Sequence, residues 1–123
     1  MRWINIENGK GRRFLEKGAK LHISVLEEEG DFGLPDIFIK DKLEYPVKDI
    51  IVYCGEGGYA SEGFVAVESD KTKRLLWIAF FEESNPFTKV SIINDRIIAH
   101  NNLKEMWAFP LYESSTIKIK LSD

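Results

Sequence analysis

The stretch LLWIAFFEESNPFTKVSIINDRIIAHNNLKEMWAFPL, residues Leu75 to Leu111, decides the fold class of this 123-residue chain. It holds two of the three tryptophans and four of the eight phenylalanines, and it begins with the uninterrupted apolar run Leu75 to Phe81. Seven apolar residues are too few to cross a bilayer and too many for a strand with one wet face. We therefore expect this run to be the central strand of a sheet that is covered on both faces.

A hairpin is predicted after this strand. Asn94-Asp95 separates two short apolar segments with the spacing of a two-residue turn, which places Ile92 opposite Ile97. Alternating or β-branched patterns predict strands over residues 2–6, 20–28, 36–41, 48–54, 63–69, 90–93, 96–99, 106–111 and 116–121. Residues 12–17 are expected to form one helical turn.

These patterns predict an all-β fold with eight to ten short strands and at most one short helix. The expected architecture is an antiparallel β-sandwich or a flattened barrel. The length of the chain fits one β-rich domain, residues 1–123.

The start of the chain predicts a cytoplasmic protein. Residues 1–5 lack the apolar core of a secretory signal, and no segment reaches the eighteen apolar residues of a membrane span. The single cysteine, Cys54, cannot form an internal disulfide, which agrees with a reducing compartment.

Charge is distributed unevenly along the chain. Residues 27–70 carry three lysines against twelve acidic residues, whereas residues 1–26 carry six basic residues against two glutamates. An acidic surface repels nucleic acid and anionic lipid and attracts basic partners. We expect a protein partner and no membrane association, and the acidic charge disfavours nucleic acid as a partner.

Catalytic chemistry has few candidate residues. His22 and His100 are the only histidines, and either could act as a base beside the Cys54 thiol if the fold brought them together. The opposing interpretation makes Cys54 a small buried core residue and gives the histidines structural roles. The sequence lacks the CxxC, HExxH and DxDxDG patterns, so we expect no metal and no cofactor.

The glycine-rich segment 55–63 superficially resembles a phosphate-binding loop. Such loops precede a helix, whereas here Glu56 and Glu62 lie within the segment and a strand is predicted to follow. The segment is interpreted either as a mobile hairpin connection or as a recognition loop that presents Tyr59 between the two glutamates.

A basic N-terminal segment supports a third possibility, nucleic-acid binding. Basic grooves with stacking aromatics hold single strands. The residues concerned are Arg2, Lys10, Arg12, Arg13, Lys17 and Lys20, with Trp3 and Phe14 among them. The acidic balance of the whole chain opposes this interpretation.

The chain resembles the small acidic immunity proteins that bacteria encode beside toxins of contact-dependent growth inhibition or other polymorphic toxin systems. The resemblance is carried by the acidic block Glu27, Glu28, Glu29 and Asp31, the loop from Glu56 to Glu62, the Trp77 to Phe81 strand, and the Asn85-Pro86-Phe87 and Asn101-Asn102-Leu103 turns. It implies a cytoplasmic, non-enzymatic protein that binds and neutralises a cognate toxin, such as a basic nuclease.

Two sets of residues are therefore predicted to contact the partner. Glu27, Glu28, Glu29 and Asp31 are expected to steer its approach electrostatically, and Glu56, Tyr59 and Glu62 are expected to form a contact loop. The alternative is a small ligand-binding or hydrolytic β domain with a pocket near His22, Cys54 and His100. A deep cleft lined by these three side chains would favour that alternative.

Overall fold

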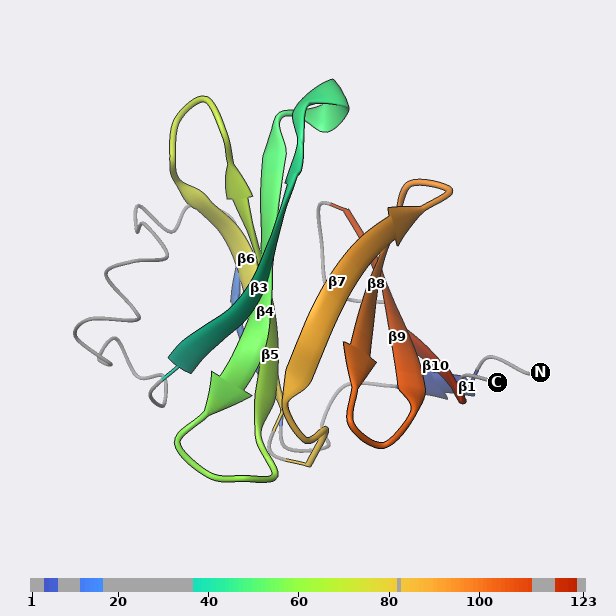
Figure 1. Ribbon diagram of the computed structural model, residues 1–123. Helices are drawn as coiled ribbons and strands as arrows, with labels where there is room; N and C mark the ends of the chain where they lie inside the picture. Colours follow the sequence, from blue (N-terminus) through green and yellow to red (C-terminus); the bar gives the residue numbers. More distant parts are fainter. Residues whose placement is uncertain (1–3, 7–11, 17–36, 82, 112–116, 122–123) are drawn as a thin grey trace.

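The structure is a computed structural model that describes residues 4–6, 12–16, 37–81, 83–111 and 117–121 (Figure 1). Within these ranges the chain forms ten strands and one short 3₁₀ helix. The elements are β1 (Ile4–Ile6), β2 (Arg12–Glu16), β3 (Ile37–Tyr45), η1 (Pro46–Lys48), β4 (Ile50–Gly57), β5 (Gly63–Ser69), β6 (Leu75–Phe81), β7 (Phe87–Ile93), β8 (Arg96–Asn101), β9 (Glu105–Pro110) and β10 (Ile117–Leu121).

The strands make two five-stranded antiparallel sheets that face each other (Figure 1). One sheet has the order β1-β10-β9-β8-β7 and the other the order β2-β6-β5-β4-β3. The sheets remain separate and do not close on each other, so the architecture is a sandwich and not a flattened barrel. The predicted all-β class is confirmed.

The apolar run forms β6, an interior strand whose side chains are buried on both faces. Trp77, Ala79 and Phe81 enter the core between the sheets, while Ile78 and Phe80 belong to a second apolar cluster on the other face of the same sheet. Two-sided burial explains why the run lacks alternation. The central position of the sheet is taken by the neighbouring strand β5, not by β6.

Aromatic side chains dominate the core between the sheets. The rings of Phe81 and Trp107 meet edge to face with centroids 4.8 Å apart, and Phe87 packs against Trp107 at 5.3 Å in the same way. Trp77 is fully buried, and its indole Nε1–H donates to the carbonyl oxygen of Leu111 at 2.9 Å. The polar atom of this large buried side chain is therefore satisfied.

The predicted hairpin is confirmed, with Ile92 paired to Ile97 across the turn. Asn94 and Asp95 have φ angles of 51° and 57°, the left-handed conformation that a type I′ turn requires at both central residues. Asparagine and aspartate tolerate this conformation better than most residues.

Two local predictions are wrong. Residues 12–16 form strand β2 and not a helical turn, because they pair with β6 and its ladder supplies their hydrogen bonds. The predicted glycine-rich loop 55–63 is shorter in the structure, because β4 continues through Gly57 and β5 begins at Gly63. The strand predicted over 20–28 lies outside the described residues.

Candidate functional site

Three connections lie together at one end of the sandwich, the lower end in Figure 1. They are residues 58–62 between β4 and β5, residues 83–86 before β7, and residues 102–104 between β8 and β9. We call these three segments the loop end. They come from both sheets, so hydrogen bonds among them join the two layers.

The first segment is built around a buried carboxylate. Glu62 is only 7% exposed, and its Oε1 accepts a hydrogen bond from the backbone N–H of Tyr59 at 2.9 Å. The N–H of Glu62 in turn donates to the carbonyl oxygen of Tyr59 at 3.0 Å. A Cβ on Gly57 would overlap the Glu62 side chain, so glycine is needed there. These contacts fix the backbone of Tyr59 while its side chain stays outside.

Asn85 connects the first segment to the other two. Its backbone N–H donates to the carbonyl oxygen of Ser61 at 2.7 Å, and its Nδ2 donates to Oδ1 of Asn102 at 2.9 Å. Asn85 has a φ of 61°, a conformation that asparagine adopts more readily than most residues. Asn85, which has a left-handed backbone conformation, therefore links all three segments of the loop end through hydrogen bonds.

The third segment is held by the side chain of Asn101. Its Nδ2 donates to the Ser84 carbonyl oxygen and to Oε1 of Glu105, both at 2.7 Å. Its Oδ1 accepts from the backbone N–H groups of Leu103 and Glu105, both at 3.0 Å. Asn101 is buried, so these bonds are shielded from competing water. The turn that carries Leu103 is consequently fixed.

The loop end presents apolar side chains on a fixed backbone. Tyr59 is 76% exposed and Leu103 is 49% exposed. Tyrosine is enriched among the residues that dominate binding energy at protein interfaces. Loops that are already ordered lose less conformational entropy when they bind. The arrangement therefore suits the docking of another macromolecule.

Searches of protein-family models, curated proteins and solved structures found no match to this chain. The geometry of the described residues therefore carries the functional assignment. Within those residues no helix has the length and apolar character needed to cross a membrane. In the same part of the chain, no three His, Cys, Asp or Glu side chains gather in a way that could hold a metal ion.

The predicted contact residues have different environments. Tyr59 is exposed as expected, but Glu62 is buried and supports the loop from inside. Glu56 lies on β4 and forms an ion pair with Lys40, with Oε1 and Nζ 3.4 Å apart. The steering residues Glu27, Glu28, Glu29 and Asp31 lie outside the described residues. Of the predicted contact loop, Tyr59 alone presents a largely exposed side chain.

The thiol and the imidazole of the alternative site do not meet. Cys54 is fully buried between the sheets, where its Sγ lies 3.7 Å from the Phe87 carbonyl oxygen. His100 lies on the opposite, outward face of the β7–β8 layer, opposite Lys89, so the sheet separates it from Cys54. Burial, together with the negative charge of Asp41, raises the pKa of the Cys54 thiol to about 12. His22 lies outside the described residues.

The remaining predicted sites fall largely outside the described residues. Of the basic N-terminal residues, Arg12 and Arg13 lie on β2, where only the backbone is described.

The sequence pattern did not identify Leu103 as an exposed side chain, although Asn101-Asn102-Leu103 is predicted to form a turn. The sequence does contain a signal for this exposure, because Leu103 is a large apolar residue that follows two turn-forming asparagines. A residue at such a position faces solvent unless the turn folds back onto the protein.

Proposed function

We propose that this chain is a non-enzymatic binding protein that docks a protein partner on its loop end. The single observation that carries the proposal is Tyr59, which is 76% exposed on a backbone fixed by the buried carboxylate of Glu62. Leu103 adds a second exposed apolar side chain at the same end. A preorganised aromatic anchor is a common source of affinity at protein interfaces.

We further propose that the partner is a toxin and that the chain acts as its cytoplasmic immunity protein. The resemblance of the acidic block and the turn motifs to immunity proteins supports this proposal. A basic toxin domain would be attracted by the twelve acidic residues between 27 and 70. In this scheme charge accelerates the encounter, and Tyr59 provides most of the affinity once the surfaces meet.

The binding surface is tested with exposed residues at opposite ends of the sandwich. The partner is the product of a toxin reading frame beside the gene, and affinity is measured by calorimetry. Tyr59→Ala is expected to weaken binding about 30-fold or more, in the range of interface hot spots. Val47 is 79% exposed on η1 at the other end of β3, so Val47→Ala is the matched control and should bind like the wild type. Equal affinities of the two variants would exclude the loop end as the binding surface.

The supporting role of Glu62 is tested separately from direct contact. Glu62→Gln keeps an oxygen that can accept the Tyr59 N–H bond, whereas Glu62→Ala removes it. Binding should therefore survive the first change better than the second. Comparable losses in both variants would instead indicate that the Glu62 charge acts on the partner directly.

The immunity role has its own readout, which is survival of cells that express the toxin. Co-expression of the wild-type chain should restore growth, and Tyr59→Ala should restore it less. Reversal of the charges at Glu27, Glu28, Glu29 and Asp31 should slow association and reduce its dependence on salt. An unchanged association rate would remove these four residues from the proposal, and unrestored growth would refute the immunity role.

A further inference from the structure

A shallow groove lies on the outer face of the sheet β1-β10-β9-β8-β7, away from the loop end. Its volume is about 300 Å³, which is at the lower limit for small-molecule sites. Its apolar lining comes from Ile93, Ile98, Met106 and Ala108, on three adjacent strands. We call this hollow the outer groove.

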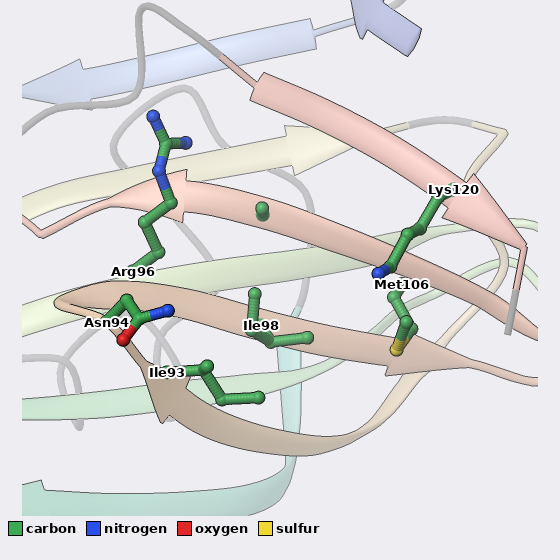
Figure 2. A pocket seen from close by; sticks show the side chains of 7 residues that line it. Ile93, Asn94, Arg96, Ile98, Met106 and Lys120 are labelled. Atoms are coloured by element: carbon green, nitrogen blue, oxygen red, sulfur yellow. The ribbon is translucent and has the colours of Figure 1, made fainter. Parts of the chain in front are cut away.

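Figure 2 shows how the side chains line the outer groove. Ile93, Ile98 and Met106 lie next to one another across the strands, and Lys120 reaches from β10 toward Met106. Arg96 lies at the opposite end, where its guanidinium extends away from Lys120. The outer groove is therefore an apolar floor with a cation at each end.

The charge of the surrounding face has one sign. Among the side chains that the structure describes, strand pairing places three cations, Lys89, Arg96 and Lys120, together with His100 on this side of the sheet. Neither aspartate nor glutamate is among the side chains that the structure places there. Although the whole chain has a net charge of −3, this face attracts anions.

Arg96 is the group that favours a specific anion. Its Nη1 is shielded from solvent and has no hydrogen-bond partner among the described residues. The adjacent carboxylate, Asp95, is already engaged, since its Oδ1 accepts from the Tyr45 hydroxyl at 2.9 Å and its Oδ2 lies 4.0 Å from Lys48 Nζ. Arg96 also lines the groove, where a carboxylate bound to its guanidinium would form charge-assisted hydrogen bonds.

We propose that the outer groove binds a small amphipathic carboxylate, with the carboxylate at Arg96 and the alkyl chain over Ile98 and toward Met106. The size of the groove favours a small molecule, because a protein partner needs roughly 800 Å² of surface on each side. Single-stranded nucleic acid is disfavoured, because the side chains placed on this face include no phenylalanine, tyrosine or tryptophan for base stacking. The proposal is independent of the loop end and of any toxin.

The test is a titration of the protein with straight-chain carboxylates, followed by backbone amide shifts in NMR. Octanoate should bind with a Kd on the order of millimolar and shift the amides of β8 and β9. Affinity should rise about fourfold per methylene from hexanoate to octanoate. Octanamide has the same chain without the charge and should bind about tenfold more weakly. Equal binding of octanoate and octanamide would overturn the proposal.

Variants separate the outer groove from general charge attraction. Arg96→Gln should weaken octanoate about tenfold, and Ile93→Ser, at an exposed position, a few-fold. Lys89→Gln is the matched control, since it removes a positive charge from the same face outside the groove and should leave the affinity unchanged. Equal losses in Arg96→Gln and Lys89→Gln would refute the site. Co-sedimentation with anionic phospholipid vesicles provides a further check. If the protein binds the vesicles more tightly than it binds octanoate, and Arg96→Gln leaves vesicle binding unchanged, the face would be assigned to a membrane surface instead.

Discussion

Asp41 and Val90 join the two sheets, with the backbone N–H of Val90 donating to Oδ2 of Asp41 at 2.9 Å. Asp41 lies on β3 and Val90 on β7, which are the edge strands of their sheets on the same side of the sandwich. A side-chain oxygen thereby satisfies an N–H of an edge strand that has no neighbour within its own sheet on that side.

Loss of this bond should destabilise the fold. Asp41→Ala leaves the Val90 N–H unsatisfied at a position where the Val90 side chain is buried, and should lower the free energy of unfolding by about 1–3 kcal/mol. Asp41→Asn retains an acceptor oxygen and should lose less. Glu44→Ala, at an exposed site on the same strand, is the control and should stay within about 0.5 kcal/mol of the wild type in urea unfolding. A similar loss in Glu44→Ala would contradict the role of the Asp41 bond.

Substitution by alanine should affect stability at one glycine of the β4–β5 region but not at another. A Cβ on Gly55 would overlap the backbone carbonyl oxygen of Phe38, which cannot move without disrupting the β3–β4 pairing. Gly55→Ala should therefore reduce stability by about 2 kcal/mol or more. A Cβ on Gly58 meets open space, so Gly58→Ala should remain within about 0.5 kcal/mol of the wild type. Thermal unfolding of both variants measures the difference, and equal shifts would show that the strand contact is not limiting.

Cys54 should be unreactive in the folded protein. Burial excludes reagents from the thiol, and the pKa of about 12 keeps the thiol protonated at neutral and mildly alkaline pH. An aromatic disulfide reagent at pH 8 should modify Cys54 only as fast as the protein unfolds, and rapidly in denaturant. Fast labelling without loss of circular-dichroism signal would reveal an accessible thiol and revive the hydrolytic alternative.

His100 should make the fold less stable in mild acid. Burial, and to a lesser extent the charge of Lys89, lowers the pKa of the His100 imidazole below its ordinary value of about 6.5. Below that ordinary value the unfolded chain binds a proton that the folded chain resists, so stability falls as pH decreases toward the folded pKa.

His100→Gln should remove this part of the pH dependence. The free energy of unfolding in urea is measured at pH 7 and pH 5 for the wild type and the variant. Subtracting the pH-dependent change of the variant from that of the wild type cancels the contributions of His22 and the carboxylates. A wild-type protein that loses no more stability than the variant between these pH values would contradict the lowered pKa.

Much of the fold could be predicted because it depends on local patterns. The seven apolar residues of β6 indicated two-sided burial, and Asn94-Asp95 indicated the hairpin and its register. Strand β2 could not be predicted in the same way. Residues 12–16 carry a weak local pattern, and their extended form depends on pairing with β6, more than sixty residues later in the chain.

The candidate sites show the same limit. The exposure of Tyr59 could be predicted, since it lies between glycines and glutamates in a predicted connection. The burial of Glu62 could not be predicted, because a glutamate in a loop is normally solvated, whereas here its side chain is buried and accepts a bond from the Tyr59 N–H. The separation of Cys54 from His100 likewise depends on which side of β8 faces the core.

The sequence by itself determined the all-β class, most of the strands, the hairpin turn at Asn94-Asp95 and the exposed aromatic of the β4–β5 connection. Periodicity and turn chemistry act over a few residues, so they can be read directly along the chain. Only the tertiary structure decided that Asn85 joins three segments, that Asp41 bridges two sheets, and that Nη1 of Arg96, beside an apolar groove, has no hydrogen-bond partner among the described residues. Alternation shows which side chains share a face, but the packing of the two sheets decides which face becomes core and which loops meet.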